Sequence, residues 1–369
     1  MKFKWFLCLV VLSVVASCST RTGRENQATI DIDMSFSGSG VNVPFQLSGM
    51  IDSVSYLRID SSVVVGNVSN VKYVGGYYYI LDGTARIHKM DESGRVLFTL
   101  EKRGRGPGEY LAITYFDINP ETEDILVFDQ VGWKLSVYDR RGKFKGSRKL
   151  VHGCNDTALL PSGKILFCYL YRDDDGNHKR GLWCEDFQGK GQKTLLEFDD
   201  DYRMVVTDPF MLSFRHLKGG GIGFLDNSRD VVFHIDRDGT AAERYQLHFD
   251  RSIPASVRRR DERVDPFRDD RVYSNVQYFE TDNWLLVSSI CNLHRIDLYY
   301  DKREGKIHLT KNDGDLVNDV GIVPRNWWWS SGDRLIAFFH PDKSDQVSAR
   351  LVPDLDDSSN PVLVIAHVN

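Results

Sequence analysis

The sequence is short of several features that would assign it to a class at once. Its 369 residues include only six cysteines, too few for a disulfide-stapled scaffold. Lys and Arg (47) do not outnumber Asp and Glu (52), so the chain lacks the basic excess of a nucleic-acid-binding protein, and we expect no nucleic-acid partner. Hydrophobic residues make up 41% of the chain and aromatic residues 12%, which is too much for a disordered protein.

Sequence signatures of catalysis and metal binding are missing as well. The chain has no His-Glu-x-x-His zinc motif, no Gly-x-Ser-x-Gly nucleophile motif and no Cys-x-x-Cys pair. The acidic run at 173–175 is followed by glycine in the fourth position, whereas a calcium-binding EF-hand loop needs glycine in the sixth. We therefore predict no cofactor and favour an interaction module over an enzyme.

The only long apolar run lies at the start of the chain. Residues 5–15 follow Lys2 and Lys4, and this run is too short for a bilayer span, which takes about 20 residues. A positive start, a short apolar run and small residues after it are typical of a signal peptide. The run ends in Val15-Ala16-Ser17-Cys18, the pattern of a lipoprotein signal that is cleaved before the cysteine. The alternative is an ordinary signal peptide with a chance cysteine.

This pattern predicts where the protein resides. We expect a signal peptide at 1–17, a lipidated Cys18 that begins a flexible tether reaching to residue 40, and a folded part at 41–369. Acyl chains on Cys18 would hold the chain at a membrane through its N-terminus. We therefore predict a lipoprotein of the cell envelope, at the outer membrane, and leave open which leaflet carries it.

The remainder of the chain is a repeat. Short runs of β-branched and aromatic residues recur at 77–82, 125–129, 164–167, 222–226, 284–287 and 334–338. Asp-x-x-Gly turns follow four of them, starting at Asp91, Asp139, Asp186 and Asp236, which are 48, 47 and 50 residues apart. Asp caps a type I turn, and Gly takes the left-handed conformation after it. A period near 50 predicts an all-β fold, a six-bladed β-propeller of four-stranded antiparallel blades.

Individual blades can be placed from the same pattern. Blade 2 is predicted to have strands at 114–118, 125–128, 134–138 and 144–150, and the other blades to begin near residues 70, 156, 213, 276 and 326. The stretch 251–273 is dense in mixed charge and is predicted to be an insertion before blade 5. Residues 52–60 are predicted to add a strand to blade 6 and so to close the ring.

The most distinctive motif joins blade 1 to blade 2. This motif is Gly104-Arg105-Gly106-Pro107-Gly108-Glu109-Tyr110, and two others accompany it: Ile51-Asp52-Ser53-Val54-Ser55-Tyr56 and Phe279-Glu280-Thr281-Asp282. With these three motifs the chain resembles a family of NHL-like, six-bladed β-propeller lipoproteins of Gram-negative gut bacteria. The resemblance covers roughly residues 50–368. It implies a fold and a location, and it brings no general biochemical activity with it.

The candidate binding residues lie on the predicted loop face. In a propeller, the loops between blades and those between the second and third strands share one side, and aromatic, guanidinium and carboxylate groups there suit a glycan or a peptide. These residues are Arg103, Arg105, Glu109, Tyr110, Trp133, His152, Arg172, Asn318, Asp319 and Arg325. An ordinary hydrated surface is the alternative for the whole set. We predict a non-enzymatic module whose partner is a glycan, a peptide or another envelope protein.

A metal-dependent hydrolase or lyase at the mouth of the channel is the alternative function. It would recruit oxygen ligands such as Glu109, Asp156, Asp208 and Asn318 around a divalent cation, although nothing in their spacing requires it.

Two cysteines flank a predicted hairpin tip. Cys168 and Cys184 are equally distant from Gly176, so a symmetric hairpin would place them opposite each other, about 4.5–5.5 Å apart at Cα. Either a cross-strand disulfide or two buried thiols would fit this placement. Both alternatives stay open at this point.

Overall fold

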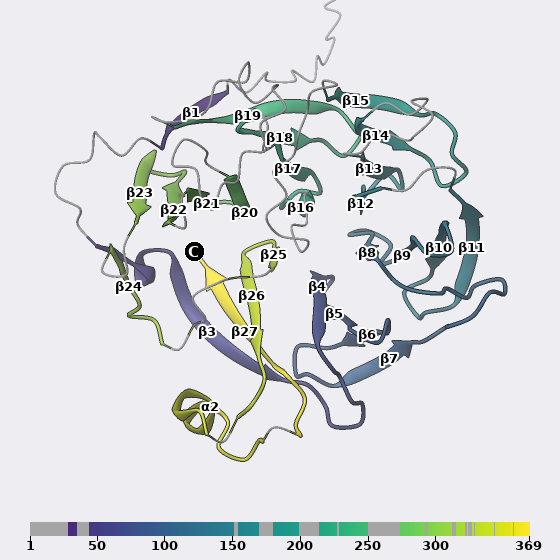
Figure 1. Ribbon diagram of the computed structural model, residues 1–369, viewed down its shortest axis with the longest axis horizontal. Helices are drawn as coiled ribbons and strands as arrows, with labels where there is room; N and C mark the ends of the chain where they lie inside the picture. Colours follow the sequence, from purple (N-terminus) through teal and green to yellow (C-terminus); the bar gives the residue numbers. More distant parts are fainter. Residues whose placement is uncertain are drawn as a thin grey trace, which may run out of the picture.

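The protein is an all-β, six-bladed β-propeller (Figure 1). The computed structural model describes residues 29–34, 44–150, 154–169, 180–198, 214–226, 229–249, 274–291, 294–311, 315–321, 323, 327, 329–342, 344–356 and 358–369. The predicted signal peptide, Cys18 and the predicted insertion at 251–273 lie outside the described residues. Within them, no helix is long and apolar enough to cross a membrane.

The first three blades each contain four antiparallel strands in sequence order. Blade 1 consists of β4 (Val68–Val74), β5 (Tyr77–Asp82), β6 (Ile87–Met90) and β7 (Val96–Leu100). Blade 2 consists of β8 (Tyr115–Ile118), β9 (Ile125–Asp129), β10 (Lys134–Tyr138) and β11 (Phe144–Lys149). Blade 3 consists of β12 (Asp156–Leu159), β13 (Ile165–Tyr169), β14 (Gly181–Glu185) and β15 (Lys193–Glu197). The strands predicted for blade 2 are confirmed to within one residue at each end.

The other three blades complete the ring. Blade 4 consists of β16 (Phe214–His216), β17 (Ile222–Asp226), β18 (Val231–Ile235) and β19 (Ala241–His248). Blade 5 consists of β20 (Ser274–Glu280), β21 (Trp284–Cys291), β22 (His294–Asp301) and β23 (Lys306–Thr310). Blade 6 consists of β25 (Trp329–Ser331), β26 (Arg334–Phe339), β27 (Val362–Val368) and the N-terminal β3 (Ile51–Arg58). A short helix α2 (Gln346–Leu351) lies between β26 and β27.

Segments from the two ends of the chain close the ring. β3 pairs antiparallel with β27, with Leu57 opposite Leu363, so the predicted closing strand is confirmed. Two further N-terminal segments pack on other blades. β1 (Ile30–Asp33) is a fifth, parallel strand beside β19, and β2 (Phe45–Gln46), followed by the 3-10 turn η1 (Leu47–Gly49), pairs with β24 (Leu316–Val317). The tether predicted to reach residue 40 is therefore too long, because β1 already belongs to blade 4.

Buried apolar side chains lie between the blades rather than in one central core. Among the described residues they form six clusters, one at each junction of neighbouring blades. The strands alternate faces, so each blade contributes side chains to the cluster on either side of it. Burial of this surface is the main driving force that holds the ring together.

The propeller has two sides that are used below. The turn face carries the turns between the first and second, and between the third and fourth, strands of each blade. The Asp-x-x-Gly turns lie here, and all four are confirmed: Gly94, Gly142, Gly189 and Gly239 have φ of +76° to +85°, and each donates its N–H to the carbonyl of its Asp. The opposite side, the loop face, carries the loops between blades and those between second and third strands.

The predicted opposition of Cys168 and Cys184 is wrong. In the β13–β14 hairpin, Cys168 lies opposite Leu182, and Cys184 lies opposite Leu166. Cys184 is a free, buried thiol, so the two cysteines do not form a disulfide. The paired residues are centred on residue 175 rather than on Gly176, so the two cysteines are displaced from each other along the strands.

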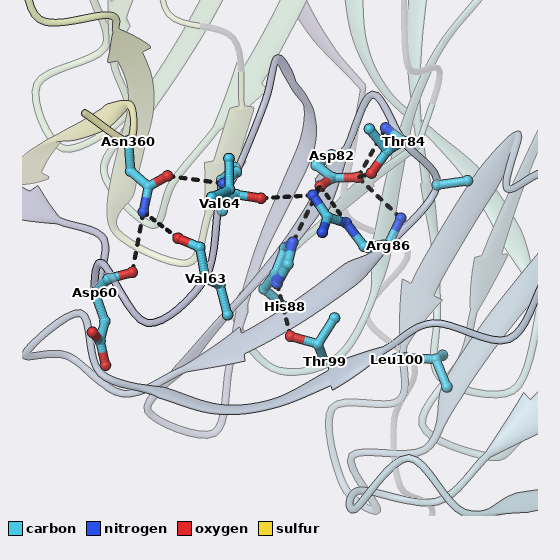
Figure 2. A network of polar contacts seen from close by, with 12 residues as sticks. Asp60, Val63, Val64, Asp82, Thr84, Arg86, His88, Thr99, Leu100 and Asn360 are labelled. Carbon is cyan, nitrogen blue, oxygen red and sulfur yellow. Dashed lines mark hydrogen bonds and ion pairs between the residues drawn. The ribbon is translucent and has the colours of Figure 1, made fainter. Parts of the chain in front are cut away.

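A polar network on the loop face ties blade 1 to residues 59–67, which lead from β3 to β4 and are called the closing segment below (Figure 2). Asp82, at the end of β5, accepts hydrogen bonds from Thr84, Arg86 and His88. Arg86 in turn donates to the carbonyl of Val64, in the segment that leads from β3 to β4. Asn360, before β27, binds three backbone groups of that same segment. The network fixes the loop face at the point where the ring closes.

Candidate functional site

The glycine-rich motif between β7 and β8 is a tight, self-bonded loop. The carboxylate of Glu109 folds back over the loop and accepts the N–H of Gly106 at 2.8 Å. A Cβ at residue 104 would lie 2.0 Å from Glu109 Oε2, and one at residue 108 would lie 2.7 Å from the ring of Phe144. Glycine is therefore required at both positions by close packing. These contacts occupy the Glu109 carboxylate within its own loop.

Tyr110 anchors the same loop from inside. Its side chain is fully buried, its hydroxyl accepts the N–H of Lys102 at 3.1 Å, and it lies 3.0 Å from the carbonyl oxygens of Ala85 and Leu100. Burial raises the pKa of Tyr110. Tyr110, which the sequence suggested as a ligand contact, is therefore a structural residue. The neighbouring Arg103 and Arg105 are exposed, and neither guanidinium forms an ion pair within the described part of the chain.

The most exposed aromatic residue of the predicted set is Trp133, in the loop between β9 and β10. Its side chain is 45% exposed, and its backbone has φ of +49°, a conformation that is unusual for a bulky residue. The buried Asp129 holds the loop, because its carboxylate accepts the N–H groups of both Gly132 and Leu111. Leu111 and Trp133 therefore lie on adjacent loops.

This corner of blade 2 is also the most apolar part of the described surface. Six large hydrophobic side chains are more than a third exposed among the described residues, and three of them, Leu111, Val131 and Trp133, belong to these two loops. With Arg103 and Arg105 nearby in sequence, the corner combines an apolar patch with guanidinium groups. We call these five residues the blade 2 corner.

The remaining predicted residues do not join this corner. Asn318 and Asp319 follow β24, on the opposite side of the ring from blade 2 (Figure 1). The Asp319 carboxylate accepts hydrogen bonds from the backbone and hydroxyl of Ser48 at 2.9 and 2.5 Å, which lower its pKa. His152, Arg172 and Arg325 lie outside the described residues. The structure thus divides the predicted loop-face site into two separate sectors.

A second polar cluster, which sequence reasoning missed, lies on the innermost strands of blades 1, 2 and 4. Asp117 on β8 is fully buried, with Lys72 of β4 at 3.2 Å and His216 of β16 at 2.7 Å. Burial alone would raise the pKa of Asp117, but the charges of His216 and Lys72 hold it well below its usual value. Its carboxylate also accepts the N–H of Leu159, so it joins four blades around the channel.

Asp156 of β12 lies near this cluster but is held differently. Among the described residues it accepts hydrogen bonds from the backbone N–H groups of Thr157 and Phe214 alone, and burial raises its pKa to about 6 although Lys72 and Arg215 oppose the shift. Arg215 is itself buried and donates to the carbonyls of Tyr278 and Phe214, and burial lowers its pKa to about 10. In the sequence, the signal that could have revealed these buried groups is a charged residue within an otherwise apolar inner strand.

A third buried network explains the Phe-Glu-Thr-Asp motif. Glu280, at the end of β20, accepts hydrogen bonds from His234 at 2.8 Å, Lys302 at 2.6 Å, Tyr245 at 3.1 Å and Tyr278. Burial opposes the ionised form, but the His234 and Lys302 bonds lower the pKa of Glu280 to about 2. These four donors to one carboxylate join blade 4 to blade 5, so the role of Glu280 is to stabilise the contact between the two blades.

Of the four residues suggested for a channel-mouth cation, two hold other partners, and Asn318 lies after β24 on the opposite side of the ring from Glu109. Glu109 is bonded within its own loop, Asp156 binds backbone N–H groups, and Asp208 lies outside the described residues. Among the described residues, no group of three or more His, Cys, Asp or Glu side chains is placed to hold a metal ion. The best-formed candidate site is therefore the blade 2 corner.

Comparison with known proteins agrees with this fold. A family described as "Domain of unknown function (DUF4934)" matches residues 28–367. No curated protein matches the chain. A "putative exported protein" from Bacteroides fragilis has a similar structure, with 16% identity, a TM-score of 0.70 and coverage of 93% of this chain and all of that chain. A DUF4221 family member from Bacteroides vulgatus is 10% identical over 86% of this chain and 97% of that chain, with a TM-score of 0.48.

Proposed function

We propose that this protein, which belongs to the DUF4934 family, is an exported, lipid-anchored binding module that holds its ligand at the blade 2 corner. Two observations support a location outside the cytoplasm: the similarity to the "putative exported protein" of Bacteroides fragilis and the predicted lipoprotein signal. The ligand is a glycan or a peptide, because an exposed indole and two guanidinium groups suit stacking and hydrogen bonding to either. The protein performs no chemistry on it.

Trp133 is the single observation that carries this proposal. The corresponding loops of blades 1 and 4 also contain a residue with positive φ, but there it is Ala85 (+61°) or Asp230 (+55°). The loop geometry therefore does not require a large side chain. A tryptophan at this position adds backbone strain and leaves apolar surface in water, and neither contributes to stability. Strain and exposed aromatic surface together are typical of binding sites.

The test is a binding screen with matched variants. Residues 29–369 are screened against glycan and peptide arrays, and each hit is measured again with Trp133→Ala and with the double variant Arg103→Ala/Arg105→Ala. We expect both variants to lose at least tenfold in affinity, whereas Val64→Ala, which changes another exposed apolar residue (74% exposed), binds normally. Hits that bind equally well to Trp133→Ala contradict the proposal.

The membrane anchor can be tested separately. Because β1 runs parallel to β19, with Ile30 beside Tyr245 and Asp33 beside His248, the chain enters blade 4 from the turn face. Residues 19–28 span at most about 35 Å, so an anchor at Cys18 would hold the edge of blade 4 within that distance of the membrane. Cys18→Ala should abolish metabolic lipid labelling, and labelling that persists rules out this anchor.

A further inference from the structure

A groove opens on the turn face, where blade 1 meets blade 2. Its volume is about 390 Å³, which is in the range of sites for small ligands and short peptides. Tyr77 of β5, Lys89 of β6 and the β7 residues Leu97 and Phe98 line it from blade 1. The groove lies on the opposite side of the propeller from the blade 2 corner.

The apolar wall of the groove comes from β7. Leu97 is 42% exposed, which makes it one of the six large apolar side chains among the described residues that are more than a third exposed. Phe98 beside it is half-buried and packs against the next turn, since a Cβ at Gly142 would lie 3.2 Å from its ring. The wall is therefore firmly held and offers aliphatic surface to a ligand.

The base of the groove carries a neutralised ion pair. Lys89 is buried, with its Nζ 2.6 Å from the Glu123 carboxylate and 4.0 Å from the centre of the Tyr77 ring. Tyr79 also donates its hydroxyl to Glu123 at 3.1 Å. The charge of Glu123 is thus matched from within the protein, and the ring of Tyr77 is covered by the ammonium group.

Two guanidinium groups at the rim leave the groove positively charged. Arg140 and Arg141, in the turn between β10 and β11, line the groove and are exposed. In the described part of the chain, neither side chain forms an ion pair, although most of the other arginines there do. Unmatched guanidinium groups beside an apolar wall attract a carboxylate that carries an apolar group, because Arg binds carboxylates in a bidentate manner.

We propose that this groove is a second binding site, which takes a short acidic peptide segment with a large apolar side chain next to its carboxylate. The carboxylate would pair with Arg140 and Arg141, and the apolar side chain would pack on Leu97. A sugar is disfavoured because Lys89 covers one face of the Tyr77 ring, which leaves less aromatic surface for stacking. A flat membrane surface is disfavoured because the apolar wall lies inside a concave groove.

The test measures binding of a labelled peptide pair by fluorescence anisotropy. The probe contains Glu next to Leu or Phe, and its partner replaces each Glu by the neutral isostere Gln. With the mature chain carrying Cys18→Ser, we expect the acidic probe to bind at least tenfold more tightly. Arg140→Ala/Arg141→Ala and, separately, Leu97→Asp should each weaken binding at least tenfold.

A charge-matched control and a site control make the result specific. Lys190→Ala/Lys306→Ala removes two exposed cations from the turn face of blades 3 and 5 and should bind the probe normally. Trp133→Ala should also bind it normally, because Trp133 lies on the other face. Equal binding of the acidic and neutral probes, or unchanged binding by Arg140→Ala/Arg141→Ala, overturns the proposal. So does arginine-dependent binding to anionic vesicles or to an acidic polysaccharide with none to the peptide.

Discussion

Blade 1 contains the same five-residue turn twice, once buried and once exposed. In Asp82-Gly-Thr84-Ala-Arg86, one carboxylate oxygen accepts the two N–H groups and the hydroxyl, and the other accepts Nε of the arginine. Asp91-Glu-Ser93-Gly-Arg95 repeats these four hydrogen bonds. The side chain of Asp82 is fully buried, whereas that of Asp91 is 23% exposed and its arginine 70%.

The difference between the two turns lies in what surrounds them. Asp82 also accepts a hydrogen bond from His88 at 3.2 Å, and Arg86 donates one to the carbonyl of Val64 in the closing segment (Figure 2). Burial alone would raise the pKa of Asp82, but hydrogen bonds from His88, Thr84 and Arg86 hold it well below its usual value. In the described part of the chain, the arginine of the buried turn thus bonds the closing segment, whereas the exposed turn meets that part of the chain through the backbone of Gly94.

Removal of the buried carboxylate should have the largest effect. Asp82→Ala removes the carboxylate that Arg86 and the fully buried His88 share, which should lower the free energy of unfolding by about 3–5 kcal/mol. Urea denaturation at pH 7 measures this change. Asp82 is ionised only above its low native pKa, so its contribution is fully present above about pH 4 and is lost as the pH falls further.

Asp91→Ala is the matched control, since it removes the same four hydrogen bonds from the exposed turn. Water replaces these bonds at little cost, so we expect its midpoint of denaturation to stay much closer to that of the unchanged protein. If Asp82→Ala and Asp91→Ala are equally destabilised, the contrast between the two turns is wrong.

The left-handed residue of each turn gives the next prediction. Gly94 (φ +85°) packs against β3, where a Cβ would lie 1.9 Å from the carbonyl oxygen of Arg58, whereas its counterpart Ala85 (φ +61°) already carries a Cβ. Gly94→Ala should therefore cost about 2–4 kcal/mol through strain and displacement of β3. Ala85→Gly should be neutral or slightly stabilising, and thermal denaturation of both variants distinguishes them.

These turns also show how far the sequence predicts the fold. The Asp-x-x-Gly spacing and the alternation of strands 125–128 and 134–138 are local signals, because turn chemistry and strand period are set by neighbouring residues. They predicted six blades and the strands of blade 2, whereas the closing strand was predicted from the position of residues 52–60 before blade 1. The Cys168–Cys184 placement was wrong because it depended on a hairpin register that no local residue determines.

The candidate site was less predictable for a related reason. Exposure separates Trp133 from Tyr110, although both lie in loops of the same face, and exposure depends on packing between blades. Asp117 and His216 are 99 residues apart, so nothing local connects them. Chemistry at a site depends on contacts between distant segments, which residue spacing alone does not reveal.

Asp156 sharpens the contrast with Asp82, because it is a buried carboxylate with no charged hydrogen-bond donor among the described residues. Its pKa of about 6 in the folded chain lies above the usual 3.8. Between these values the folded state keeps the proton and the unfolded state releases it, so stability falls as the pH rises from about 4 to 6, by about 2–3 kcal/mol. Above pH 6 the loss is complete.

Asp156→Asn should remove this slope. Other carboxylates, such as Glu280 with a pKa of about 2, lose their contribution below about pH 4.5, so the informative quantity is the difference between the variant and the unchanged protein. Denaturation at half-unit steps from pH 4 to pH 7 measures it. Parallel stability curves for the two proteins contradict the assignment of the raised pKa to Asp156.

Trp133 extends the comparison to a left-handed residue that is neither glycine nor buried, and here the expected effect on stability is the smallest. Trp133→Gly relieves the backbone strain at φ of +49° but makes the unfolded chain more flexible, so the free energy of unfolding should change by less than about 1 kcal/mol. Ligand binding at the blade 2 corner should nevertheless be lost. A large loss of stability would show instead that the indole holds the loop, as Tyr110 does.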